Sequence, residues 1–463
     1  MSAHVIHADC LTALRDMPDA SVDAVVTDPP YGLSNTTPAQ VADTITRWAS
    51  GDREYLPSKV GFMGHEWDGF VPPVAVWDEC LRVLKPGGHL LAFAGSRTHD
   101  LMTLGIRLAG FEIRDSVAWL YGSGFPKSLD VSKAIDSTGG VSAADQARVL
   151  RAARERAGMT REEVAAAVGC TPGSLRDWED GRARAKGRAV EHVTPSPAYR
   201  AALADLLGYT QDERVITGTG GRTRGFFKSG HRGIEYGEAQ TDAAREWEGW
   251  GTALKPAFEP VTLARKPLDG TVAANVLEHG TGALNIDGSR IGGPSGRWPA
   301  NVVLDESQAA ELDRQSGNVK TGATKPHRRD PDSSPMFKVG KWMTHSQPAS
   351  EGGASRFFYV AKAPKSERPV VDGTAHPTVK PLALMRWLVR MVTLPGGTVL
   401  DPFAGSGTTL EAAMLEGFNV VGIEREADYL PLIHARIERA TAELEARAEA
   451  DADTLFPIDG TAS

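Results

Sequence analysis

The stretch Asp401-Pro402-Phe403-Ala404-Gly405-Ser406-Gly407 decides the fold of this chain. A short apolar segment precedes it and a segment with helical spacing follows it, so it is predicted to form the turn between a strand and a helix. Its glycines allow a backbone to approach a bound nucleoside closely. Glu424 ends the next predicted strand, where a carboxylate can accept hydrogen bonds from both ribose hydroxyls. This order predicts the nucleoside-binding part of a doubly wound α/β sheet, and the absence of a GxxxxGK[ST] pattern argues against a triphosphate cradle.

A second motif, Asp28-Pro29-Pro30-Tyr31, follows the buried strand predicted over residues 23–27. Asp28 offers a carboxylate that can accept hydrogen bonds from an exocyclic base amine, whose lone pair is otherwise delocalised into the ring. Pro29 and Pro30 stiffen the turn and lack N–H groups, and Tyr31 offers a flat face to a base turned out of a duplex. On its own the motif is equally consistent with a rigid turn. Paired with the late motif, it predicts two ends of one sheet meeting across an insertion.

Strands alternate with helices at both ends of the chain, which is typical of a parallel sheet flanked by helices. The middle is rich in glycine, proline and polar residues, and its regular elements are hard to identify. We therefore predict a Rossmann-like α/β sheet formed from both chain ends. The predicted boundaries are 1–120 for the first half, 121–350 for the inserted region, 351–440 for the second half and 441–463 for an acidic tail.

Within the insertion, residues 142–209 have clear helical spacing with capping residues between successive helices. Thr160 and Glu163 form a capping box, and the segment ending in Trp178-Glu179-Asp180-Gly181 resembles a helix-turn-helix of the phage-repressor type. Its third helix would enter the major groove. The candidate DNA contacts are Thr171, Ser174, Arg176, Arg182 and Arg184. The alternative is a helical packing insert that never reads sequence.

Composition narrows the functional classes. The 463 residues carry a net charge of −8, with basic clusters confined to the insertion, as expected if one face docks on DNA. The apolar runs are too short to span a membrane and no secretory signal follows Met1, so a cytoplasmic protein is expected. Cys10, Cys80 and Cys170 show no CxxC spacing and no Pro-Cys context, which argues against a zinc site and against methylation of cytosine carbon 5.

The order of the two motifs resembles that of the β class of DNA amino-methyltransferases, which place their target-recognition region between them. His376-Pro377-Thr378-Val379-Lys380-Pro381 is similar to the segment that precedes the cofactor motif in this family, and Asp9 lies in a segment similar to its early Gly-Asp element, although Ala8 replaces the glycine. The resemblance implies S-adenosyl-L-methionine as cofactor. The implied cofactor contacts are Asp9, Thr378, Lys380, Asp401, Phe403, Gly405, Gly407 and Glu424.

The resemblance further implies methylation of adenine N6 in double-stranded DNA, by base flipping and direct transfer without a metal. Cytosine N4 is the alternative target, and Asp rather than Ser at position 28 favours adenine. RNA methylation, and a DNA-binding regulator built on an inactive scaffold, are further alternatives. The segment 248–260, rich in glycine and aromatic residues, could line the base pocket. The family also implies a prokaryotic or phage-encoded protein that acts away from membranes, as a homodimer or with a cognate restriction endonuclease.

Overall fold

The computed structural model describes most of the chain: residues 2–34, 36–57, 68–124, 128–139, 143–180, 182–185, 188–191, 195–208, 242–323, 327–328, 342–343, 349–361, 367, 369–371, 373–376 and 378–455. It divides into two compact units, one formed by residues 1–124 with 256–463 and the other by residues 125–255. In the described part of the chain, no helix is both long and apolar enough to cross a bilayer.

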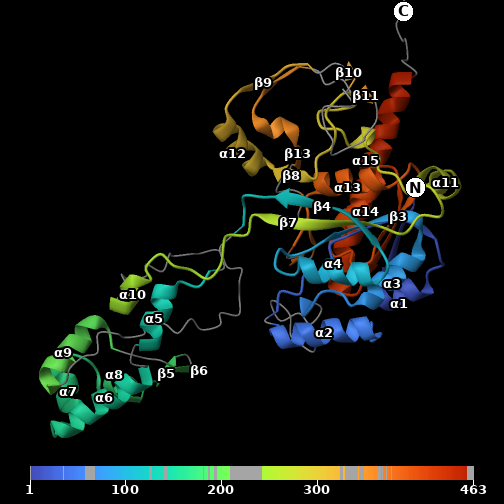
Figure 1. The fold of residues 1–463 in the computed structure, drawn as a ribbon. Helices are drawn as coiled ribbons and strands as arrows, with labels where there is room; N and C mark the ends of the chain where they lie inside the picture. Colours follow the sequence, from blue (N-terminus) through green and yellow to red (C-terminus); the bar gives the residue numbers. More distant parts are fainter. Residues whose placement is uncertain are drawn as a thin grey trace, which may run out of the picture. The chain divides into compact units, whose positions relative to one another are not determined.

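A nine-stranded sheet forms the centre of the first unit (Figure 1). Its spatial order is β1 (Ala3–His7), β17 (Asn419–Glu424), β16 (Thr398–Asp401), β2 (Val22–Thr27), β3 (Leu84–Phe93), β7 (Phe258–Arg265), β4 (Glu112–Leu120), β8 (Val302–Asp305) and β13 (Tyr359–Ala361). These neighbours pair in parallel, apart from β7, which is antiparallel to both β3 and β4. The predicted Rossmann-like sheet built from both chain ends is confirmed: β16 pairs directly with β2.

Helices cover both faces of this sheet (Figure 1). One face carries α13 (Leu382–Val392), α14 (Thr408–Leu415) and α15 (Leu430–Leu455), and the other carries α1 (Cys10–Asp16), α3 (Val74–Val83) and α4 (His99–Leu108). The first unit also contains α2 (Pro38–Ser50), α11 (Val272–His279), α12 (Glu306–Ser316), β9 (Val319–Thr321), β10 (His327–Arg328), β11 (Trp342–Met343), β12 (Ser350–Gly352), β14 (Val370–Val371), β15 (Thr374–Ala375) and the 3-10 turns η3 (Asp287–Ser289), η4 (Ala354–Phe357) and η6 (Ala427–Tyr429).

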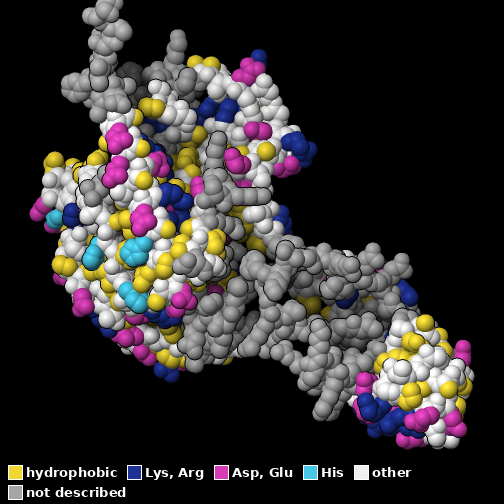
Figure 2. Space-filling view, turned by 180° about the vertical axis from the view of Figure 1, so that it is seen from behind, with side chains coloured by type: hydrophobic (Ala, Val, Ile, Leu, Met, Phe, Trp, Pro, Cys, Tyr) yellow, Lys and Arg dark blue, Asp and Glu magenta, His cyan; other side chains and the backbone are white. Residues whose placement is uncertain are grey.

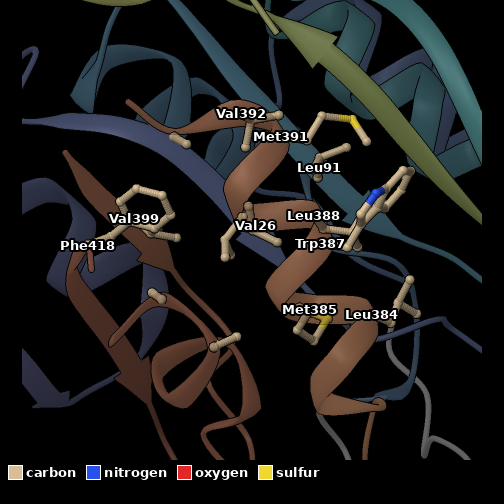
Figure 3. Close-up of a cluster of buried hydrophobic side chains, with 14 of the residues drawn as sticks. Val26, Leu91, Leu384, Met385, Trp387, Leu388, Met391, Val392, Val399 and Phe418 are labelled. Atoms are coloured by element: carbon tan, nitrogen blue, oxygen red, sulfur yellow. The ribbon is translucent and has the colours of Figure 1, made fainter. Parts of the chain in front are cut away.

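Alternation along the central strands divides their apolar side chains between two cores. Val26 and Leu91 lie in one core with the apolar stripe of α13, whose Leu384, Trp387 and Leu388 are drawn against them in Figure 3. Their neighbours Val25 and Leu90 lie in the other core, under α1, α3 and α4. β2 is buried at all six positions, and the alternating apolar side chains of Val22, Ala24, Val25 and Val26 supply both cores.

The structural boundaries differ from the predicted ones. The predicted insertion 121–350 supplies β7 and β8 to the sheet, so the second unit spans only residues 125–255. The apolar run 261–264 is buried between β3 and β4, and this burial holds β7 in the first unit. The predicted tail 441–463 begins inside α15, which runs from Leu430 to Leu455 without a break at residue 440. Residues 456–463 lie outside the described part.

The second unit contains the helical segment that the sequence predicts. Its helices are α6 (Ala143–Arg156), α7 (Arg161–Val168), α8 (Pro172–Asp180) and α9 (Pro197–Leu207), around a small apolar core that includes Leu150, Val164, Leu175 and Leu203. The capping box of Thr160 and Glu163 is present, and Gly169 ends α7 with a φ of 76°. The unit also holds α5 (Val131–Gly139), α10 (Asp242–Glu246), β5 (Arg182–Ala185) and β6 (Arg188–Glu191), and α5 packs against α10.

Candidate active site

The two sequence motifs meet where neighbouring strands end. Thr27 is the last residue of β2 and Asp401 is the last residue of β16. The Thr27 hydroxyl donates a buried hydrogen bond of 2.7 Å to Oδ1 of Asp401, although the two residues are 374 positions apart in sequence. Asp28 therefore leaves the sheet beside the loop that begins at Asp401. The sequence expectation that the early motif and the glycine loop share one edge of the sheet agrees with this geometry.

Asp401 itself is buried, and burial raises its pKa to about 6. Hydrogen bonds from Thr409, from Thr27 and from the backbone N–H of Phe403 oppose that rise. Its carboxylate thus ties the glycine loop to β2, and Phe403 packs partly buried against one of the two cores. Asp401 is a structural link between the motifs as well as a candidate cofactor residue.

Asp28 belongs to a cluster of three charged side chains, which also includes Lys380 and Glu259. Lys380 Nζ lies 2.5 Å from Oδ2 of Asp28 and 3.3 Å from Oε2 of Glu259. Its side chain is only 7% exposed and its ammonium lies over the rings of Tyr31 and Phe93. Burial favours the neutral amine, but the two carboxylates outweigh burial and raise the pKa of Lys380. The cluster therefore holds two negative charges and one positive charge in a mostly buried place.

The Tyr31 hydroxyl completes this cluster. It lies 2.8 Å from Oδ1 of Asp28 and 2.9 Å from Oε2 of Glu259. Burial, and then the two neighbouring carboxylates, raise the pKa of Tyr31 well above its ordinary value, so the phenol keeps its hydrogen. The predicted role of Tyr31 as a flat face for a base now has a second feature, because its hydroxyl joins two acidic side chains.

Backbone contacts hold the turn that carries Asp28 and Tyr31. Pro29 is buried and Pro30 is partly buried. The backbone N–H groups of Tyr31 and Gly32 both donate to Oδ1 of Asp68 at 3.1 Å. Gly32 has a φ of 66°, and a Cβ there would lie 2.6 Å from the backbone nitrogen of residue 71. Only glycine fits this position, so the turn has one conformation.

The glycine loop is held from the side by Glu424. Its Oε2 accepts a hydrogen bond of 2.7 Å from the N–H of Gly405, and its Oε1 accepts one of 2.7 Å from the N–H of Glu426. Burial raises the pKa of Glu424. A Cβ at Gly405, where φ is 52°, would lie 3.1 Å from the His376 ring, and Gly407 has a φ of 81° against the backbone of α15. These close contacts and the positive φ values favour glycine at both positions, and each Glu424 oxygen keeps a second lone pair for a ribose hydroxyl.

Two further predicted cofactor residues lie near this loop with their side chains exposed. Asp9 follows β1, which pairs with β17 so that His7 lies opposite Glu424. Its carboxylate accepts hydrogen bonds from the N–H groups of Leu11 and Thr12 and caps α1. Thr378 contacts His376 through its backbone. Lys380, predicted to contact the cofactor, forms an ion pair with Asp28.

In the second unit, the predicted DNA contacts lie immediately before α8, on it and after it. The hydroxyls of Thr171 and Ser174 lie 2.9 Å apart, and Thr171 also accepts the Ser174 N–H, so this pair begins the helix. The Arg176 side chain is 59% exposed. Arg182 and Arg184 belong to β5, and their side chains lie outside the described part. Figure 2 shows basic and acidic side chains gathered together on this helical lobe.

Sequence reasoning gave Glu259 and Asp68 no individual role in the site. Glu259 opens β7, and antiparallel pairing sets it opposite Trp119, near the carboxyl end of β4. Glu259 therefore lies near the beginning of its own strand, whereas site residues of a parallel sheet are expected where the strands end. Its sequence signal was its place in the segment 248–260, for which lining a base pocket and packing as a loop were equally open interpretations. Asp68 lies far from the motif in sequence and shows no pattern of its own.

Comparison with known proteins agrees with this geometry. A family model described as DNA methylase matches residues 22–138 and 288–435, more than half of the chain. A second model, described as a helix-turn-helix domain, matches residues 147–215. The first match covers β2 with the early motif, and β16 and β17 with the glycine loop, while the second covers α6 to α9.

Individual relatives match over short segments. The type II methyltransferase M.BglI of Bacillus subtilis is 44% identical over 63 residues, which is 14% of this chain and 18% of the relative. The type II methyltransferase M.ScaI of Streptomyces caespitosus is 40% identical over 73 residues, 16% of this chain and 24% of the relative. The matched segments thus span about a fifth of the length of these relatives.

Solved structures match over nearly the whole chain at low identity. PvuII DNA methyltransferase (cytosine-N4-specific) is 13% identical, with a TM-score of 0.39 over 96% of this chain and 91% of its own. The M1.HpyAVI–SAM complex is 13% identical, with a TM-score of 0.34 over 94% of this chain and 98% of its own.

Proposed function

Since this chain belongs to the DNA methylase family, we propose that it transfers the methyl group of S-adenosylmethionine to N6 of adenine in double-stranded DNA. The observation that carries the proposal is the Thr27–Asp401 hydrogen bond, which sets Asp28 beside the glycine loop. A carboxylate that can bind an amine and a loop that can bind a nucleoside thus share one edge of the sheet. Their adjacency supports transfer between two bound molecules.

In this proposal Asp28 accepts hydrogen bonds from the exocyclic amine of a base turned out of the duplex. This contact draws the nitrogen lone pair out of conjugation with the ring and aims it at the methyl donor. Lys380 and Tyr31 orient the carboxylate by holding one oxygen each. Preorganised contacts of this kind lower the barrier because little rearrangement is needed during the reaction.

The residues of the glycine loop fit the cofactor. Gly405 and Gly407 let the loop follow its path against His376 and α15, Glu424 offers lone pairs to the ribose, and Phe403 offers a ring beside it. When bound, S-adenosylmethionine supplies a methyl group on a positively charged sulfur.

We assign target recognition to the second unit, in which α8 offers Arg176 to DNA. The choice of adenine over cytosine depends on Asp28 in place of serine. The cytoplasmic location, the homodimer and the partner endonuclease all stay predictions.

The test is incubation of the purified chain with labelled S-adenosylmethionine and unmethylated bacterial DNA, followed by digestion and separation of the nucleosides. We expect label in N6-methyladenine. Label in N4-methylcytosine would keep the enzyme and change its target base. No transfer to any DNA, together with binding of DNA by α8, would support the inactive regulator instead.

A further inference from the structure

The hydroxyl of Tyr31 contacts two carboxylate oxygens but has only one hydrogen to donate. A phenol carries one hydrogen and can accept others. It lies 2.8 Å from Asp28 and 2.9 Å from Glu259, so with both acids ionised it can donate to only one of them. The second short contact becomes a hydrogen bond when the other carboxyl group holds a proton. The row formed by Asp28, Tyr31 and Glu259 therefore has one short oxygen–oxygen contact more than the Tyr31 hydrogen can serve.

The net charge of the cluster also leaves a place for one more proton. Asp28 and Glu259 carry two negative charges, and Lys380 between them carries one positive charge. One more proton makes the cluster neutral. The side chains of Asp28 and Glu259 are 21% and 20% exposed, whereas that of Lys380 is 7% exposed. Glu259 is thus the member of the row, other than Asp28 itself, through which a proton can reach water.

We propose that Glu259 is the proton acceptor of the transfer site and receives the proton released by the amine through Tyr31. The inference rests on the proposed function, because methylation of an amine must release a proton. The nitrogen–methyl bond forms as the sulfur–methyl bond breaks, and the nitrogen then loses one hydrogen to Asp28. Asp28 passes this proton to the Tyr31 oxygen while Tyr31 gives its own hydrogen to Glu259. Asp28 and Tyr31 return to their starting forms, and Glu259 releases the proton to water.

The order of strands in the sheet supports this role. Because β7 is antiparallel, its first residues lie at the edge where β3 and β4 end. Glu259 therefore reaches the Tyr31 hydroxyl from a different element of the sheet than Asp28 does. This arrangement separates the group that binds the amine from the group that disposes of its proton.

The test compares wild type with Glu259→Gln and Glu259→Ala in single-turnover methyl transfer to DNA. Gln keeps the size and an acceptor oxygen but cannot take up the proton. We expect Glu259→Gln to lower the rate constant by about a hundredfold, at the lower end of what general base catalysis contributes, and to leave the cofactor dissociation constant unchanged. Glu112→Gln is the matched control: Glu112 lies on β4 of the same sheet, pairs with Arg265 and should keep the wild-type rate.

Rescue distinguishes proton transfer from positioning. Acetate or formate should restore part of the rate of Glu259→Ala in proportion to its concentration, and should leave wild type unaffected. An unchanged rate in Glu259→Gln, or a slow Glu259→Ala that neither anion accelerates, would overturn the inference while the proposed function stands. A wild-type chain that transfers no methyl group overturns both. Thermal unfolding of each variant identifies any that fails to fold, and Tyr31→Phe, which breaks the row in the middle, should then reproduce the loss.

Discussion

At the scale of single residues, the site consists of buried charges that neutralise each other. A lone buried lysine or carboxylate would cost several kcal/mol, and such groups remain charged in proteins when they are paired. Lys380 serves both Asp28 and Glu259, which keeps its pKa high despite burial. The same contacts keep the Asp28 carboxylate in one orientation, as a hydrogen-bond acceptor for an amine requires.

Asp401 predicts a pH dependence of stability. Burial raises its pKa from 3.8 in the unfolded reference to about 6. Between these values the folded chain binds more protons than the unfolded chain, so the contribution of Asp401 to stability falls as the pH rises through this window. Asp401→Asn keeps an acceptor oxygen for Thr27 and removes the titration. The unfolding free energy of the variant minus that of wild type should therefore increase by on the order of 3 kcal/mol as the pH rises from about 4 to about 7. Urea denaturation at a series of pH values measures this difference. Parallel curves for the two proteins would contradict this assignment.

Part of this residue-level picture could be predicted from sequence. Asp28, Gly405 and Glu424 belong to short motifs at strand ends, and such motifs can be recognised from nearby residues alone. Glu259 could not be predicted as a partner of Tyr31, because their contact depends on the pairing of strands 228 positions apart. For the same reason, the ion pair of Lys380 with Asp28 could not be predicted, since the two residues are 352 positions apart.

At the scale of elements, α8 is held by a buried acidic residue. Glu179 is fully buried and pairs with Arg154 of α6 at 2.5 Å and with Arg161 of α7 at 2.7 Å. These pairs join three helices around a small core and leave Arg176 on the exposed side of α8. The helix boundaries were predictable because Thr160, Gly169 and the other caps are local signals. The direction of β7 was not predictable, because an apolar run does not report which way its neighbours point.

The exposed position of Arg176 predicts a role in DNA affinity. Arg176→Ala should weaken DNA binding and, if the guanidinium contacts a phosphate, lower the slope of log affinity against log salt concentration by about one. Arg156→Ala is the matched control, since Arg156 is an exposed arginine at the end of α6 in the same unit. Affinity and salt slope can be measured by fluorescence anisotropy on a labelled duplex. If the two substitutions changed DNA affinity and salt slope equally, Arg176 would have no specific role in DNA binding and α8 would serve only for packing.

At the scale of the whole molecule, the two chain ends contribute different parts of one site. The first end supplies Asp28 and Tyr31, and the last end supplies the glycine loop and Glu424. Direct pairing of β2 with β16 joins them, so residues 125–255 form a compact unit of their own without interrupting the sheet. This division was predictable from the order of the motifs, whereas its boundaries were not, because β7 and β8 lack motifs and are held by burial.

The central claim is that Asp28 acts in transfer while the late loop binds the cofactor. It is tested most directly by measuring the single-turnover rate constant against S-adenosylmethionine concentration for wild type, Asp28→Asn and Phe403→Ala. The account predicts that Asp28→Asn lowers the plateau by about a hundredfold or more at an unchanged half-saturating concentration. Phe403→Ala should raise the half-saturating concentration and largely keep the plateau. A wild-type plateau in Asp28→Asn would contradict the account.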